Sequence, residues 1–327
     1  MRLLLLAAAA AATITGPLLA QSRTSEFDSV NQPQPVDSVS QTEDVGFRTD
    51  SHERMTVPVR LGGKGPFRFL VDTGADRTAI SREVARDLKL EPGIRASLHS
   101  VSGVSVVETV RIPTLELTQK SVRVANAPLL NSFDMGADGI LGIDSLKSQR
   151  IMFDFRAQRM SIVPSRVAEV RPEEGTIVVR ARERKGRLIL SRAVADGQGI
   201  AVVLDTGAQL TIGNEALRRR LLRSGGRSVV ERMGQIQLRS VTGDKITGEY
   251  VMLRELTIGG ATLSNLAVVF ADAHTFRQLN LDKRPAVLLG MNALRAFDKV
   301  SIDFANRKLR LVLPQRSDSR SVHYAAR

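Results

Sequence analysis

The sequence of 327 residues contains no cysteine and no tryptophan, and aromatic residues make up only 4% of it. Without cysteine the chain cannot form disulfides, hold a metal through thiolates or use a cysteine nucleophile. Because aromatic side chains are so few, we expect any substrate pockets to be lined mostly by aliphatic groups.

Two further signatures of catalytic sites are missing. The four histidines, His52, His99, His274 and His323, are scattered and lack the spacing of metal ligands. No Gly-x-Ser-x-Gly elbow is present to carry a nucleophilic serine. We therefore predict a site with no metal and no cofactor, and we interpret each histidine as a surface residue or a satisfied core residue.

The N-terminus carries a targeting pattern. Arg2 is followed by the apolar run Leu3–Ile14 and by a break that leads to Ala20, which is the order of a secretory signal peptide. We predict a signal peptide over residues 1–20 and a secreted or periplasmic location. An uncleaved N-terminal membrane anchor is the alternative, since the apolar stretch just reaches spanning length. Residues 21–50 are rich in Ser, Gln, Asp and Pro, which predicts a flexible linker.

The rest of the composition is that of a globular protein with a positive charge. Apolar residues make up 43% and charged residues 25% of the chain, and its length suffices for two domains. The formal charge of +13 favours anionic lipid or acidic partners, because a secreted protein seldom meets nucleic acid. The runs Arg218–Arg220 and Arg180–Arg187 are candidates for such a membrane-binding patch, although runs of this kind are usually solvated faces.

After residue 50 the sequence repeats itself in order. The matched segments are Phe69–Ala75 with Val202–Ala208, Ser100–Gly103 with Ser240–Gly243, Gly139–Gly142 with Val287–Gly290, and Met152–Phe155 with Ser301–Phe304. Four matches in one order, at slowly growing separations, indicate an internal duplication with insertions. We place a first lobe at residues 51–164, an inter-lobe linker at 165–175, a second lobe at 176–314 and a basic tail at 315–327.

Each repeat has the pattern of a mainly β lobe with one short helix. The predicted strands are Met55–Leu61 and Phe67–Val71 in the first copy, and Leu188–Val194 and Ile200–Leu204 in the second, each pair joined by a glycine-rich turn. The predicted helices begin after the caps Ser81 and Asn214 and stop at Pro92-Gly93 and Gly225-Gly226.

The strongest chemical signal is an Asp-Thr-Gly motif at the end of an apolar strand in each copy. Burying the charge of Asp72 or Asp205 there costs free energy unless hydrogen bonds or an opposite charge compensate it. Gly74 and Gly207 leave room for a tight turn whose amides approach the carboxylate. If the lobes meet face to face, the two carboxylates share one proton. A water between them can then hydrolyse an amide by general acid–base catalysis, without a nucleophilic side chain.

These motifs resemble a known family. Apolar–apolar–Asp-Thr-Gly-Ala, followed by Ile-Leu-Gly or Leu-Leu-Gly and a short helix, is similar to the retropepsin-like aspartic proteases, in particular their tandem, secreted or periplasmic bacterial members. The resemblance covers about Met55–Pro164 and Gly186–Pro314. It implies two acid-protease β-barrel lobes in tandem with pseudo-twofold symmetry, and an aspartic-type endopeptidase with Asp72 and Asp205 as its catalytic pair.

The resemblance also implies roles for the neighbouring residues. Thr73 and Thr206 would grip one another across the lobes, Gly142 and Gly290 would pack beneath the active loops, and the hairpin tips at Ser102, Gly103, Thr242 and Gly243 would be flaps over the substrate. The chain departs from single-chain pepsins, because neither tip carries a tyrosine. Pepsins also place Ser or Thr after Asp-Thr-Gly, where this chain has alanine. Losing that hydroxyl predicts a working pH nearer neutral.

Several alternatives remain at this point. The same scaffold without catalysis would be a peptide-binding module. An actin-like ATP-binding fold, also a duplication with aspartate loops, has little support, because each loop holds only one glycine for phosphate. Asp154 and Asp303, near the end of each repeat, are interpreted as structural hydrogen-bonding residues. For the enzyme we expect an extended peptide or protein substrate, lobes that pair within one chain, and a role in processing exported or membrane proteins.

Overall fold

The computed structural model describes residues 54–117, 121–167, 173–224 and 231–314, together with four short strands outside these ranges. The signal peptide, linker and basic tail predicted for 1–20, 21–50 and 315–327 therefore lie outside the described residues, except for those strands. Strands account for 54% of the chain and helices for 13%, which confirms the mainly β class. Within the described ranges, no helix combines the length and hydropathy needed to cross a membrane.

The first lobe is a closed barrel. Its strands are β4 (Met55–Leu61), β5 (Lys64–Val71), β6 (Ala79–Ser81), β9 (Thr109–Glu116), β10 (Ser121–Leu130) and β11 (Gly139–Leu141), and the hairpin β7 (Ala96–His99) with β8 (Val104–Val107) projects from it. The pairing order β4-β5-β11-β6-β10-β9 returns to β4, which closes a ring of six strands. Gly62 and Gly63, with φ of 57° and 75°, form the two-residue turn between β4 and β5.

The second lobe repeats this ring. Its strands are β15 (Arg182–Arg184), β16 (Arg187–Ala195), β17 (Gln198–Leu204), β18 (Thr211–Gly213), β19 (Glu231–Arg239), β20 (Lys245–Ile258), β21 (Ala261–Phe270) and β22 (Ala286–Leu289), with β1 (Ala11–Ala12) and β25 (Ser321–His323) at the two edges. The order β16-β17-β22-β18-β21-β20 closes because β20 also pairs with β16. Two closed barrels are incompatible with the actin-like alternative.

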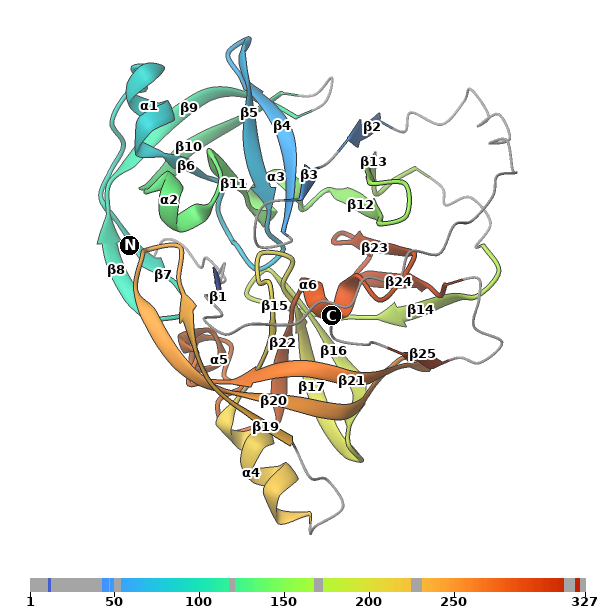
Figure 1. Ribbon diagram of the computed structural model, residues 1–327. Helices are drawn as coiled ribbons and strands as arrows, with labels where there is room; N and C mark the ends of the chain where they lie inside the picture. Colours follow the sequence, from blue (N-terminus) through green and yellow to red (C-terminus); the bar gives the residue numbers. More distant parts are fainter. Residues whose placement is uncertain are drawn as a thin grey trace, which may run out of the picture.

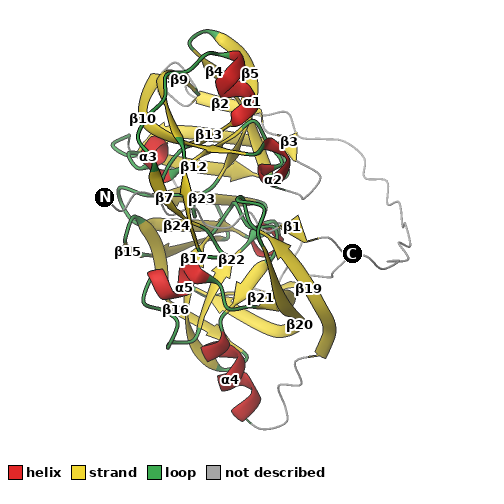
Figure 2. Cartoon of the chain, turned by 90° about the vertical axis from the view of Figure 1, so that its left-hand side faces the viewer, coloured by secondary structure: helices red, strands yellow, loops and turns green. Residues whose placement is uncertain are grey.

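A third sheet joins the lobes. It contains β2 (Glu43–Gly46), β12 (Gln149–Asp154), β13 (Arg159–Pro164), β14 (Thr176–Arg180), β23 (Lys299–Asp303) and β24 (Lys308–Val312). β12 of the first lobe pairs antiparallel with β23 of the second, with Met152 opposite Ser301. In Figure 1 this sheet lies to the right between the two barrels, and Figure 2 shows the barrels stacked one above the other. Phe153 and Ile302 are fully buried in the core that the lobes share.

Short strands also occur where composition predicts a linker. β2 adds to the edge strand β13, and β3 (Arg48–Thr49) pairs with Thr56 and Met55 of β4. A polar segment can pair with the edge of a sheet through backbone hydrogen bonds alone. Such a strand has no alternating apolar pattern, so the sequence does not predict it. Residues 43–46 and 48–49, in the last third of the predicted linker, therefore contribute strands to two of the sheets.

The helices are short and cover the ends of the barrels. They are α1 (Arg82–Asp87), α2 (Ser132–Met135), α3 (Ile143–Leu146), α4 (Glu215–Arg223), α5 (His274–Gln278) and α6 (Met291–Leu294). The predicted caps are confirmed, because Ser81 Oγ accepts a hydrogen bond from the Val84 amide and Asn214 Oδ1 accepts one from the Leu217 amide. α1 ends at Asp87, earlier than the predicted stop at Pro92-Gly93, and Lys89 follows in the left-handed conformation.

Candidate active site

The two Asp-Thr-Gly loops leave the barrels at equivalent positions. β5 pairs in parallel with β11, and the Asp72 amide donates to Leu141 O at 3.1 Å at the end of that pairing. β17 pairs in the same way with β22, and the Asp205 amide donates to Leu289 O at 3.0 Å. Both aspartate side chains are completely buried. The barrels therefore deliver two carboxylates to one enclosed place.

Backbone amides of each loop satisfy one oxygen of each carboxylate. The Gly74 amide donates to Asp72 Oδ1 at 2.7 Å, and the amides of Gly207 and Ala208 both donate to Asp205 Oδ1 at 3.1 Å. The Oδ2 atoms of Asp72 and Asp205 accept no hydrogen bond from any described residue. Each carboxylate is thus anchored through one oxygen, while the other remains available for chemistry.

The Asp72 carboxylate lies directly against the opposite loop. A Cβ atom added to Gly207 would be 2.3 Å from Asp72 Cγ, so only glycine permits this approach. The contact explains why the second motif requires glycine at this position.

The threonines of the two motifs join the loops. Thr206 Oγ1 accepts a hydrogen bond from the Thr73 amide at 3.0 Å and donates to Val71 O at 2.7 Å. From the other side, Thr73 Oγ1 accepts from the Thr206 amide at 3.1 Å and donates to Leu204 O at 3.1 Å. We call these four bonds the threonine grip. The grip fixes the two aspartate loops against each other in a buried interface.

The environment makes both aspartates weak acids. Burial raises the pKa of Asp72 to about 6, against the opposing effects of the Arg187 charge, the Gly74 amide and the Arg54 charge. Burial also raises the pKa of Asp205 well above its ordinary value, the Asp72 charge raises it further, and Arg187 opposes both effects. The pair therefore holds a proton at a pH where ordinary carboxylates have lost theirs.

Two buried arginines belong to this site, and the sequence analysis did not single them out. Arg54 directly precedes β4, Arg187 is the first residue of β16, and both are fully buried. Arg187 Nη2 lies 3.7 Å from Asp76 Oδ1 of the first lobe, and Arg54 Nη2 donates to Met135 O at 2.6 Å. The interpretation of Arg180–Arg187 as a solvated run is wrong for Arg187, because the lobes enclose it. Arg54 and Arg187 are separated by the same number of residues as Asp72 and Asp205, so they occupy equivalent positions in the duplication. This equal spacing is the sequence signal that could have identified them.

Gly142 and Gly290 lie beneath the continuation of the aspartate loops. A Cβ atom at Gly142 would be 2.4 Å from the carbonyl carbon of Arg77, and one at Gly290 would be 2.5 Å from Leu210 O. Close backbone contact leaves no space for a side chain at either position. The two glycines thus allow the backbone of each loop to pack closely against the barrel.

The predicted flap residues lie at the tips of two hairpins that meet. Ser102 and Gly103 form the turn between β7 and β8, whereas Thr242 and Gly243 lie in the turn between β19 and β20. The tips are joined through Asp244, whose Oδ2 accepts hydrogen bonds from Ser102 Oγ at 3.1 Å and Thr242 Oγ1 at 2.7 Å. The hydroxyls therefore hold the tips together, and within the part of the chain that the structure describes neither is hydrogen-bonded to Asp72 or Asp205.

Asp154 and Asp303 are structural, as interpreted from the sequence. Asp154 Oδ1 accepts from the Ala157 amide at 2.8 Å, and Asp303 Oδ1 accepts from the Asn306 amide at 2.9 Å. Each carboxylate closes the turn after its strand in the sheet that joins the lobes.

Comparison with known families agrees with the geometry. Residues 57–148 match the family described as gag-polyprotein putative aspartyl protease, and residues 192–293 match the family described as aspartyl protease. None of the curated proteins matches the chain. Each match contains one Asp-Thr-Gly loop and most of one six-stranded ring. The chain therefore contains two retropepsin-like aspartyl protease domains in tandem.

Proposed function

We propose that this protein is an aspartic endopeptidase in which Asp72 and Asp205 form one composite catalytic site. The observation that carries the proposal is the pair of buried carboxylates, each anchored through Oδ1 and each with an Oδ2 that accepts no hydrogen bond from a described residue. The threonine grip and the raised pKa values of both groups support it.

The reaction follows from a shared proton. With one proton on the pair, the ionised carboxylate takes a proton from a water molecule while the protonated carboxyl gives its proton to the substrate carbonyl oxygen. The water oxygen bonds to the carbonyl carbon and gives a tetrahedral diol. Proton transfer to the amide nitrogen then breaks the C–N bond and releases an acid and an amine. Because the pKa of Asp72 is raised to about 6 and that of Asp205 lies well above its ordinary value, the pair still holds one proton at near-neutral pH.

The substrate and location belong to the same proposal. An extended peptide would lie as a strand between the hairpin tips and the aspartate loops, read through alternate side-chain pockets. The lobes pair within one chain, since the second aspartate is intact and the linker at 165–175 is short. The N-terminal pattern supports a secreted or periplasmic protein that processes exported or membrane proteins, and the excess of Lys and Arg supports contact with an anionic membrane surface.

The test is cleavage of an unbiased peptide mixture from pH 3 to 8, with products identified by mass spectrometry. We expect the wild-type chain to cut internal peptide bonds and both Asp72→Asn and Asp205→Asn to abolish cutting. Asp303→Asn is the matched control, because Asp303 is a buried aspartate whose Oδ1 accepts from the Asn306 amide in the sheet that joins the lobes, outside the Asp-Thr-Gly loops. It should retain cleavage. Intact peptides in every sample would identify a peptide-binding module instead.

A further inference from the structure

Each hairpin tip is held by the lobe to which it does not belong. We call β7–β8 the first flap and β19–β20 the second flap. Val101 at the first tip is fully buried in a cluster with Ile212 and Phe276 of the second lobe. Val241 at the second tip is fully buried in a cluster with Leu98 and Met135 of the first lobe. The structure thus shows both flaps in a closed, docked arrangement.

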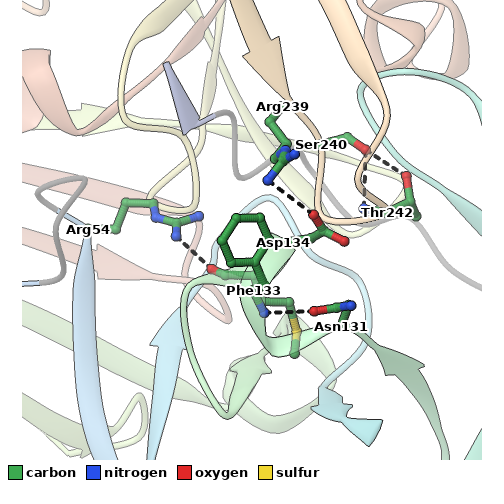
Figure 3. A network of polar contacts seen from close by, with 8 residues as sticks. Arg54, Asn131, Phe133, Asp134, Arg239, Ser240 and Thr242 are labelled. Carbon is green, nitrogen blue, oxygen red and sulfur yellow. Dashed lines mark hydrogen bonds and ion pairs between the residues drawn. The ribbon is translucent and has the colours of Figure 1, made fainter. Parts of the chain in front are cut away.

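The second flap is fastened by an ion pair. Arg239, the last residue of β19, reaches α2 of the first lobe, where Nη1 lies 3.5 Å from Asp134 Oδ1. Its guanidinium also lies 4.9 Å from the centre of the Phe133 ring. Figure 3 shows Phe133 and Asp134 of α2 facing Arg239. We call this contact the Arg–Asp latch.

The first flap is fastened at the equivalent position by two histidines. His99 precedes Ser-Val-Ser-Gly as Arg239 precedes Ser-Val-Thr-Gly, so the two residues correspond in the duplication. His99 Nδ1 lies 2.9 Å from His274 Nε2 at the start of α5, with the rings stacked at 5.2 Å. The His274 amide also donates to Val101 O at 2.8 Å. We call this contact the His–His latch.

The two latches respond differently to protons. A hydrogen bond between two imidazoles needs one N–H donor and one nitrogen lone pair, so it survives when the pair carries no extra proton or one. A second extra proton removes the lone pair and places two positive charges in contact. Guanidinium and carboxylate, by contrast, stay oppositely charged through mildly acidic conditions. Only the latch of the first flap can therefore be released by weak acid.

We propose that the first flap is a pH-sensitive lid, which the second proton on His99 and His274 releases while the Arg–Asp latch keeps the second flap closed. The inference rests on the proposed function and deepens it, because it assigns regulation of access to the proposed peptide site between the hairpin tips and the aspartate loops. Opening would be one-sided, so that an entering peptide meets a mobile hairpin above one lobe and a fixed hairpin above the other.

Charges around the His–His latch set the pH of release. On the α5 side, Arg277 and Asp272 form an ion pair with each other; Arg277 disfavours protonation of His274 and Asp272 favours it. From the second flap, Asp244 faces the first tip through Ser102. Burial, then the His99 and Arg277 charges, lower the pKa of His274 below its ordinary value near 6.5. The latch is therefore intact above pH 6.5 and weakens as pH falls below it.

The absence of cysteine allows a direct measurement on the full chain. Spin labels at Val106→Cys on the first flap and Leu222→Cys on α4, both exposed positions, report the first flap. Labels at Lys245→Cys on the second flap and Arg86→Cys on α1 form the matched pair. Between pH 7.5 and 5 we expect the open fraction of the first flap to rise about fivefold, the effect of losing one hydrogen bond, with no change for the second.

The chain itself supplies the control for this measurement. His99→Arg with His274→Asp copies the Arg–Asp latch onto the first flap and should remove its pH response. His274→Gln, which does not titrate, should do the same if the double variant folds poorly. An equal response of both flaps, no response of either, or a response that persists in these variants would overturn the proposal. Spin-label distances do not depend on cleavage, so a missing peptidase activity would overturn only the proposed function.

Discussion

The two lobes are built on the same barrel, yet their contacts across the pseudo-twofold axis have diverged to different degrees. Thr73 and Thr206 make the same hydrogen bonds from both sides, whereas His99 and Arg239 use different chemistry at equivalent positions. The grip fixes the approach of two carboxylates, so a change on one side alone would displace both. A latch only holds a tip, and either chemistry suffices for that.

The surroundings of the two buried arginines are less symmetric than the threonine grip and more symmetric than the latches. Arg187 faces the carboxylate of Asp76, four residues after Asp72, but the position four residues after Asp205 is Gln209. The arginine is kept in both lobes while its acidic counterpart is kept in one. The lobes thus match at the threonine grip beside Asp72 and Asp205, and they differ at Asp76 and at the hairpin latches.

The largest effect should come from removing charge at the pair itself. Because the pKa of Asp72 is raised from 3.8 to about 6, the folded state binds its proton more tightly than the unfolded state. That contribution to stability is complete below pH 3.8 and is lost as pH rises through about 6. Asp72→Asn should therefore raise the free energy of unfolding by about 3 kcal/mol at pH 8 and by nothing at pH 3.5. The free energy of unfolding is measured in urea at both pH values. An equal increase at pH 8 and pH 3.5 would show that ionisation of Asp72 is not the cause.

Symmetry of the threonine grip is tested by truncating each side in turn. Thr73→Ala leaves the Thr206 amide and Leu204 O without their partner, and Thr206→Ala does the same to the Thr73 amide and Val71 O. Each should lower the free energy of unfolding by about 2 kcal/mol. Serine at either position keeps the hydroxyl and should recover most of the loss. Clearly unequal losses in urea melts would show that the grip is one-sided.

Arginine substitution tests the asymmetry around the pair. Arg187 acts on the charge of both aspartates, whereas Arg54 is a weaker influence on Asp72. Arg187→Met should move the pH profile of kcat/KM to higher pH by about one unit, because losing a nearby cation raises the pKa of a carboxyl. Arg54→Met should move it less. Arg187→Lys keeps the charge and serves as the control; the opposite ranking of the two methionine variants would refute the assignment.

The smallest effect should come from making one lobe copy the other. Asp144 Oδ1 accepts from Thr78 as Asn292 Oδ1 accepts from Thr211, at 2.8 Å from the hydroxyl in both lobes. Burial raises the pKa of Asp144, so ionisation costs stability as pH rises. Asp144→Asn should be neutral at pH 3.5 and stabilising by less than about 1 kcal/mol at pH 8. Thermal unfolding at pH 3.5 and pH 8 is the measurement. Destabilisation at pH 8 would show that Asp144 and Asn292 do not play equivalent roles in the two lobes.

The sequence predicted those features that depend on one segment at a time. The bounds of β4, the caps Ser81 and Asn214, and the aspartate loops follow from local pattern, turn chemistry and the duplication. Apart from the threonine grip, which the family resemblance implied, contacts between the lobes did not follow, because the burial of Arg54 and Arg187 arises only when two barrels meet. For the same reason the sequence did not predict that Val101 and Val241 are each buried in the core of the opposite lobe. A valine in a hairpin turn gives no indication of which core will enclose it.

The pairing of β12 with β23 has a consequence for how the site behaves at low concentration. A site assembled from two separate chains falls apart on dilution, since its two halves must find each other again by diffusion. In this structure both strands belong to one chain, so each half experiences a constant effective concentration of the other. The two aspartate loops should therefore stay paired on dilution, and the proposed peptidase should show the same activity per molecule at every protein concentration.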